Sequence, residues 1–251
     1  MSVDRTGVST PTKHKVASSA ATSPPHKGPI GALERRRQRS VEGLKLLAVI
    51  VTAMWIVEVI NALHSNKLDT TGGIYPRNIE HLWAIFTSPF LHAGFGHLIA
   101  NTIPFVFMGA IIALQGAARL ALVTAIVIII GGLGTWLISP GGTDTVGASG
   151  MVFGYAAYLL ARGLFDRSVV ELLVGGIVGL LWGWALIASL VPHGNVSWQG
   201  HLTGALGGII AAWLLAGWDR RGRRELPVGL GSRSRRLSPA ARGPSAGPSD
   251  K

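Results

Sequence analysis

Four polar residues at the starts of apolar segments have side chains of the types that carry out acyl transfer: His97, Asn101, Ser149 and His201. A serine hydroxyl is a weak nucleophile until a neighbouring base takes its proton, and His201 is the candidate base for Ser149. The acidic residues near the ends of apolar segments lie away from these positions, so none completes a triad. The predicted catalytic unit is therefore a Ser–His dyad with Ser149 as nucleophile.

Acyl transfer also needs donors for the charge that develops on the substrate oxygen. His97 and Asn101 are four residues apart, which places them on one face of a predicted helix. Ser149 opens another apolar segment, where the first backbone N–H groups of a helix have no internal partner. We expect His97, Asn101 and the Ser149 N–H to form an oxyanion hole. A soluble hydrolase elbow is excluded, because Met151 stands where its second glycine is required.

The composition indicates a membrane protein. The chain has 251 residues, of which 48% are hydrophobic and 14% charged, and its mean hydropathy is +0.41. A soluble domain carries about a quarter charged residues. With no cysteine, the chain has no disulfide framework, thiolate metal site or cysteine nucleophile. We expect neither a metal nor another cofactor.

Six stretches are long and apolar enough to be read as transmembrane helices, each close to the 20 or so residues that a bilayer requires. The predicted fold is an all-α membrane protein, a bundle of six transmembrane helices over residues 43–63, 97–114, 119–138, 149–165, 169–191 and 198–218.

The positive charges orient these segments. With both termini in the cytoplasm, 21 of the 23 Lys and Arg residues lie on the inner side, and only Lys67 and Arg77 lie outside. The second, fourth and sixth segments then all begin at the outer face. The polar residues at their starts therefore share one depth, on the outer side of the bilayer.

Glycines predict which of these segments touch. Gly150 and Gly154 are four residues apart on the fourth segment, and Gly200, Gly204 and Gly208 continue the same spacing on the sixth. Such stripes allow helix backbones to approach closely in lipid. If the two stripes face each other, the serine and the histidine come within hydrogen-bonding reach.

The two ends of the chain differ from the core in composition. Residues 1–42 and 219–251 are basic and rich in Ser, Pro, Thr and Gly, so we expect disordered cytoplasmic tails on either side of a single domain over residues 43–218. Because both basic tails flank apolar segments, they are read as topology signals attracted to anionic lipid, with no nucleic acid as partner.

Three motifs together resemble the rhomboid intramembrane serine proteases, over about residues 75–218. They are "HAGFGHLIAN" from His92, "GASG" from Gly147 and "GHLTGALGG" from Gly200. The resemblance implies Ser149 as nucleophile and His201 as general base. It implies an oxyanion hole made of the residues given above.

The resemblance also implies supporting roles for the remaining motif residues. Phe153 matches an aromatic residue that packs against the catalytic histidine, and His92 matches an additional histidine of the motif. The supporting set is His92, Gly147, Gly150, Phe153, Gly204 and Gly208. The Trp-Arg pair frequent in the first loop of the family is missing, and "GIYPR" at residues 73–77 occupies that region.

Two other functions fit part of the pattern. A small transporter would explain six segments and glycine stripes, but no charged residue lies at mid-bilayer, where ion coupling needs one. The second alternative is a rhomboid-like protein that binds membrane clients without cutting them. Such a protein should lack the serine or the histidine, and this chain has both. Glu58, near the outer end of the first segment, is interpreted as an interfacial or helix-pairing group.

The expected function is that of an intramembrane serine endopeptidase in a cell membrane, with its active site facing outward. The resemblance implies substrates that are helices of other membrane proteins. A helix buries its carbonyls in internal hydrogen bonds, so cleavage requires a segment that unwinds easily, marked by Gly, Pro or other weak helix formers near its outer end. The substrate and the oligomeric state are not specified by the sequence.

Overall fold

The computed structural model describes residues 29–192 and 196–224, with side chains up to residue 216. In this part of the chain the regular elements are all helical. In chain order they are α1 (Pro29–Leu63), α2 (Lys67–Gly72), the 3-10 turn η1 (Ile79–His81), α3 (Ala84–Thr87), the 3-10 turn η2 (Ser88–Phe90), α4 (Phe95–Ala113), α5 (Ala117–Ile138), α6 (Ser149–Asp166), α7 (Val169–Ala188) and α8 (Trp198–Arg224).

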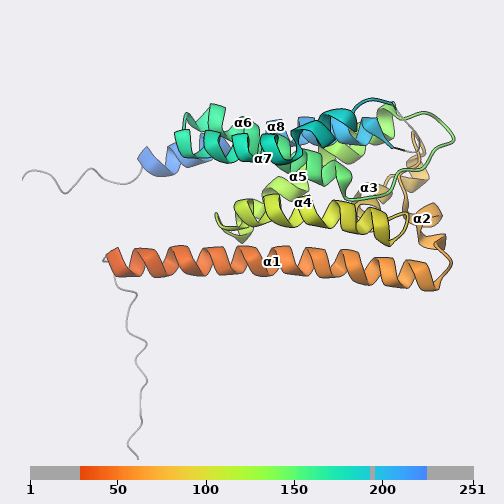
Figure 1. Cartoon of the computed structure of the whole chain (residues 1–251), viewed down its shortest axis with the longest axis horizontal. Coiled ribbons are helices and arrows are strands. Elements are labelled where there is room, and N and C mark those ends of the chain that lie inside the picture. The colour runs from red at the N-terminus through yellow and green to blue at the C-terminus, as the bar shows by residue number, and fades with distance from the viewer. Residues whose placement is uncertain (1–28, 193–195, 225–251) are drawn as a thin grey trace, which may run out of the picture.

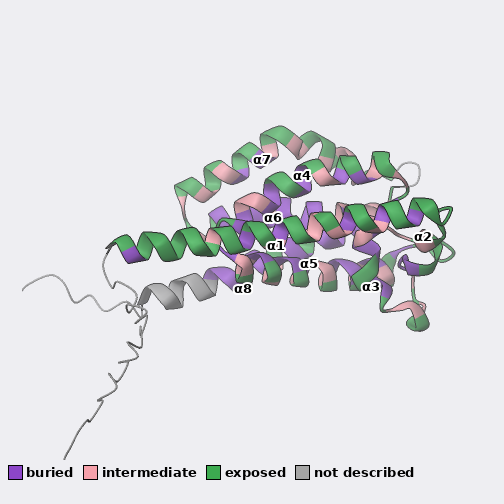
Figure 2. Cartoon of the chain, turned by 90° about the horizontal axis from the view of Figure 1, so that it is seen from below, coloured by how far each residue is buried: buried purple, intermediate pink, exposed green. Residues whose placement is uncertain are grey.

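The long helices run side by side, and the short elements α2 and α3 gather at one end of the bundle (Figure 1). Helix α6 lies at the centre, where buried residues concentrate, whereas α1 and α7 are exposed along much of their length (Figure 2). Large apolar side chains on α7, such as Leu180 and Trp184, are more than four-fifths exposed. Such a surface is suited to lipid rather than to water.

Four helices are long and apolar enough to cross a membrane: α1, α4, α5 and α7. The other two long helices are less apolar: α6 carries Arg162 and Asp166 in its second half, and α8 begins with the polar residues around His201. Both pack inside the bundle on several neighbours, so their surroundings are largely protein. The structure therefore gives a helical membrane protein with four clear spans, and the count of six stays a prediction.

The predicted N-terminal tail is wrong in part. Residues 29–42 were expected to be disordered, but α1 begins at Pro29 and is continuous to Leu63. The Ser40 hydroxyl donates to the carbonyl of Leu114 at 2.7 Å, and Gly43 lies directly against the backbone of Ala113. These contacts extend the helix past its apolar part.

Helix α8 likewise continues to Arg224, beyond the expected end of the last span at residue 218. The rest of both predicted tails, residues 1–28 and 225–251, lies outside the described residues.

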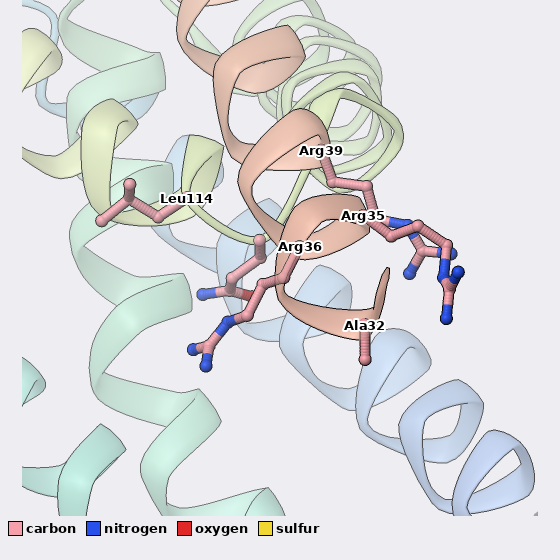
Figure 3. Close-up of a pocket in the computed structure, with 6 residues that line it drawn as sticks. Ala32, Arg35, Arg36, Arg39 and Leu114 are labelled. Carbon is pink, nitrogen blue, oxygen red and sulfur yellow. The ribbon is translucent and has the colours of Figure 1, made fainter. Parts of the chain in front are cut away.

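A basic cluster occupies the start of α1, at the opposite end of that helix from α2. Arg35, Arg36 and Arg39 line a hollow of about 290 Å³ together with Ala32, Leu114 and Gln115. Figure 3 shows the Arg35 and Arg39 side chains extending together from α1, while the Arg36 side chain extends from another face of the helix. Positive charge is thus concentrated where α1 meets the turn between α4 and α5.

Candidate active site

Ser149 and His201 meet at the N-terminal ends of α6 and α8. The Ser149 Oγ and the His201 Nε2 are 2.9 Å apart. The serine is half-buried, and the histidine is 5% exposed. The structure thus brings the two residues singled out from the sequence into direct hydrogen-bonding contact.

Glycines bring the two helices into backbone contact. A Cβ added at Gly204 would collide with the carbonyl oxygen of Gly150, and one added at Gly208 would collide with the carbonyl oxygen of Gly154. The two stripes predicted from the sequence do face each other. Because this seam between α6 and α8 admits no side chain, the spacing of the two helices is fixed by their backbones.

The other ring nitrogen of His201 is held by a backbone group. Its Nδ1 is 2.9 Å from the carbonyl oxygen of Ser189, the residue that ends α7. A carbonyl can only accept, so Nδ1 carries the proton and Nε2 is left to accept from the Ser149 hydroxyl. The ring of Phe153 stacks on the imidazole, with centroids 4.2 Å apart and planes 3° from parallel.

His97 and Asn101 converge on the residue two positions before the serine. A Cβ at Gly147 would lie 2.7 Å from His97 Cε1, 3.0 Å from His97 Nε2 and 3.7 Å from Asn101 Nδ2. Gly147 also has a φ of 120°, which side-chain-bearing residues rarely adopt. Only glycine fits this position, and the two polar groups therefore lie against the turn that leads into α6.

The donors of these two residues face the turn. The backbone N–H of Ala93 points at His97 Nδ1 at 3.4 Å, which leaves the ring proton on Nε2, the atom nearer Gly147. Asn101 is 6% exposed, and its Nδ2 has no hydrogen-bond partner among the described residues. Two donors are thus available beside the serine, as an oxyanion hole requires.

His92 supports the turn at residues 147 and 148, which leads into α6. Its side chain is fully buried, its Nε2 accepts from the backbone N–H of Ala148 at 3.3 Å, and its ring contacts that of His97 with centroids 5.3 Å apart. Burial, and next the neighbouring His97, lower the pKa of His92 to about 4. The imidazole is therefore neutral at neutral pH and able to accept.

The first loop is anchored although it lacks the Trp-Arg pair. The guanidinium of Arg77 donates to the carbonyls of Leu137 and Ser139 at 3.0 and 2.8 Å. The indole N–H of Trp136 donates back to the carbonyl of Asn78 at 3.0 Å. Arg77 of "GIYPR" thus fastens the loop to the end of α5.

Sequence reasoning missed several groups around the site. The carbonyls of Ser189 and Ser88 belong to the backbone, and the second accepts from the Gly147 N–H at 2.9 Å. Asn61 carried no motif that would mark it.

Glu58 was interpreted from the sequence as an interfacial or helix-pairing group. It is fully buried, and its carboxylate interacts with the Asn61 side chain and with the backbone of His92 and Gly94.

The fold and this site define a helical membrane protein with a hydrogen-bonded serine and histidine at the ends of two packed helices. A family model described as "Rhomboid domain" matches residues 80–218. The chain therefore belongs to the rhomboid family.

The chain is also similar to several bacterial proteins. An uncharacterized protein of Mycobacterium tuberculosis, Rv1337, is 42% identical over 196 residues, covering 75% of this chain and 81% of its own. The putative rhomboid protease YdcA of Bacillus subtilis is 34% identical over 133 residues, covering 53% of this chain and 66% of its own. The rhomboid protease GluP of Bacillus subtilis is 30% identical over 137 residues, covering 52% and 25%.

Proposed function

We propose that this protein is a serine endopeptidase that hydrolyses peptide bonds near the outer ends of transmembrane helices. The observation that carries the proposal is the 2.9 Å hydrogen bond between Ser149 Oγ and His201 Nε2. Family membership and relatives named as proteases support it further.

In the proposed reaction His201 Nε2 takes the proton of the Ser149 hydroxyl as Oγ attacks the carbonyl carbon of the substrate. The carbonyl oxygen becomes an oxyanion that accepts from His97 Nε2, Asn101 Nδ2 and the Ser149 N–H. The tetrahedral intermediate collapses when His201 returns its proton to the leaving amine and the C–N bond breaks. Water then hydrolyses the acyl-enzyme ester, with His201 again acting first as base and then as acid.

The end of α7 supplies the electrostatic support that an acid gives in a triad. The C-terminal carbonyls of a helix are the negative end of its dipole, so they favour a cation beside them by about 0.3–1 kcal/mol or more when partly buried. The Ser189 carbonyl is such a group and holds the Nδ1 proton of His201. It thereby stabilises the imidazolium that forms during the reaction.

We infer six spans with both termini in the cytoplasm, in a cell membrane, and an active site that opens outward. The distribution of Lys and Arg supports this orientation. The cluster of Arg35, Arg36 and Arg39 is near the start of α1, and the His92 loop lies against that helix near its other end. Substrates would be helices of membrane proteins with a segment of weak helix formers near the outer end.

The test uses purified full-length protein, a fluorophosphonate probe read by intact mass, and a model rhomboid substrate. Wild type should gain one adduct and cleave the substrate. Ser149→Ala and His201→Ala should lose the adduct and reduce cleavage by about 10⁴-fold or more, with unchanged thermal unfolding. A folded wild type that takes no label and leaves the substrate intact would contradict the proposal and favour a client-binding protein.

A further inference from the structure

A buried asparagine joins three segments of the chain beside the site. Asn61 is completely buried near the end of α1. Its Nδ2 donates to Asp69 Oδ1 of α2 at 2.9 Å and to the carbonyl of His92 at 3.5 Å. Its Oδ1 accepts from the backbone N–H of Leu68 at 3.0 Å. Both N–H donors and the acceptor of this one amide are thus used.

The segment that Asn61 holds is irregular and leads directly into the site. Residues 91–94 connect η2 to α4 in an irregular turn: Leu91 closes η2 by donating to the Ser88 carbonyl, the Gly94 carbonyl accepts the first hydrogen bond of α4, and Gly94 has a φ of 101°. At one end the His92 side chain accepts from Ala148, the residue before Ser149. At the other end the Ala93 N–H contacts His97 Nδ1. The position of this segment therefore sets the place of two predicted parts of the oxyanion hole.

Helix α2 supports the segment from the same side. A Cβ at Gly72 would lie 2.7 Å from Leu91 Cδ1, so the end of α2 packs directly on the residue before His92. The carbonyl of Gly72 accepts from the Thr87 hydroxyl at 2.9 Å. Asp69, one turn earlier on α2, fixes the Asn61 amide in the orientation that reaches the His92 carbonyl.

We propose that Asn61, oriented by Asp69, is a positioning residue for catalysis: it holds residues 91–94 so that His92 and His97 place the oxyanion hole beside Ser149. The inference rests on the proposed function. It requires that losing the hydrogen bond to the His92 carbonyl lowers turnover even when the link between α1 and α2 is kept.

Exchanging the side chains of Asn61 and Asp69 separates the link between α1 and α2 from the hydrogen bond to the His92 carbonyl. In the double variant Asn61→Asp with Asp69→Asn, a carboxylate on α1 accepts from an amide on α2 and from Leu68, so the link between the helices survives. The carboxylate has no donor for the His92 carbonyl. The single variant Asp69→Asn keeps every Asn61 hydrogen bond, because the new amide oxygen accepts in place of the carboxylate.

The full-length proteins are compared by kcat and KM on a model rhomboid substrate, with active sites counted by fluorophosphonate labelling. We expect the double variant to melt lower than Asp69→Asn, because its new carboxylate is buried beside Glu58, and to lose about 10- to 100-fold in kcat per active site at similar KM, the scale of a misplacement of about 1 Å. Asp69→Asn, which keeps the donor to the His92 carbonyl, should lose clearly less kcat than the double variant.

A stability control and a fallback complete the experiment. Thr124→Val removes a buried hydrogen bond of 2.6 Å to Tyr155 Oη, far from the loop, and should lower the melting temperature without lowering kcat per active site. Should the double variant not fold, Asn61→Ser, which adds no charge and loses the same donor, takes its place.

Wild-type kcat in the folded double variant, or in its replacement, would overturn the inference and leave Asn61 as a link between helices only. Wild type without labelling or cleavage would instead overturn the proposed function.

Discussion

The two sides of the candidate site are built in opposite ways. Ser149 and His201 lie on a seam where glycines of α6 and α8 bring backbone against backbone. His97 and Asn101 face the same serine from α4, beside a loop fastened by Asn61 and His92. The first side is positioned by the absence of side chains and the second by specific polar side chains. We therefore expect substitutions of the seam glycines to fail through loss of the fold, and substitutions that release the loop beside His97 to fail through loss of turnover.

The largest effect is expected at the glycine seam. Gly204→Ala places a methyl group against the Gly150 carbonyl, and because a backbone cannot move aside locally the helices must separate, at a cost of about 3 kcal/mol or more. The melting temperature in detergent should drop and labelling of Ser149 should disappear. Gly183→Ala on α7, where the added methyl meets open space, should be neutral or slightly stabilising. Equal melting of the two variants would refute the tight seam.

The polar side should be sensitive to acid through His92. Its folded pKa of about 4 lies below the ordinary 6.5, so below pH 6.5 the unfolded chain binds a proton that the folded chain does not. Stability contributed by the neutral ring is present above pH 6.5 and falls as the pH drops toward 4, by about 2 kcal/mol at pH 5. His92→Gln can still accept from Ala148 and does not titrate.

Melting temperatures of wild type and His92→Gln between pH 7 and pH 5 check this prediction. The wild type should lose more stability over that interval than the variant. Parallel curves for the two proteins would mean that the ring takes up its proton in the folded state.

A smaller effect is expected where Phe153 stacks on His201. Aromatic pairs contribute about 0.5–1.5 kcal/mol beyond their buried area. Phe153→Leu should therefore lower kcat/KM by about three- to tenfold, whereas Phe153→Tyr keeps the stacked ring and should retain activity. The comparison is made on folded protein by active-site titration. A fully active Phe153→Leu would show that the Ser189 carbonyl alone orients the base.

The smallest effect concerns Asp69. Burial, and then repulsion by Asp144, raise its pKa, while Asn61 and His97 act in the opposite direction. The folded chain therefore holds this proton at a pH where the unfolded chain has lost it, and stability falls as the pH rises from 3.8 through the folded pKa. Asp69→Asn should melt progressively higher relative to wild type across that interval. A constant difference between the two melting curves would contradict the assignment.

The glycine seam and the residues around it were predictable because their signals are local. Helical spacing alone marks Gly204 and Gly208 as a stripe, and the four-residue interval between His97 and Asn101 puts both on one face. The orientation of the apolar segments then brings the starts of α4, α6 and α8 to one end of the bundle, as the structure has them.

The groups that hold the polar side in place were not predictable for two reasons. They include the carbonyls of Ser88 and His92, and every residue has a carbonyl, so no residue type marks them; the Ser189 carbonyl that holds His201 is unmarked for the same reason. Asn61 and Asp69 depend on how an irregular loop folds back on α1, which periodicity does not describe. The boundary at residue 42 was wrong for a related reason, because α1 is extended by contacts with the turn after α4 rather than by its own apolar residues.

The hydrogen bond between Ser189 and His201 makes the protonation pattern of the base depend on the position of a neighbouring helix. If the last turn of α7 moves away, Nδ1 loses its acceptor, and the imidazole is free to rotate or to exchange tautomers, so that its basic nitrogen no longer faces the serine. Helix α7 is also the most lipid-exposed of the four clear spans. In the proposed enzyme, a shift of α7 within the bilayer would therefore change the reactivity of the serine while Ser149 and His201 themselves stay unaltered.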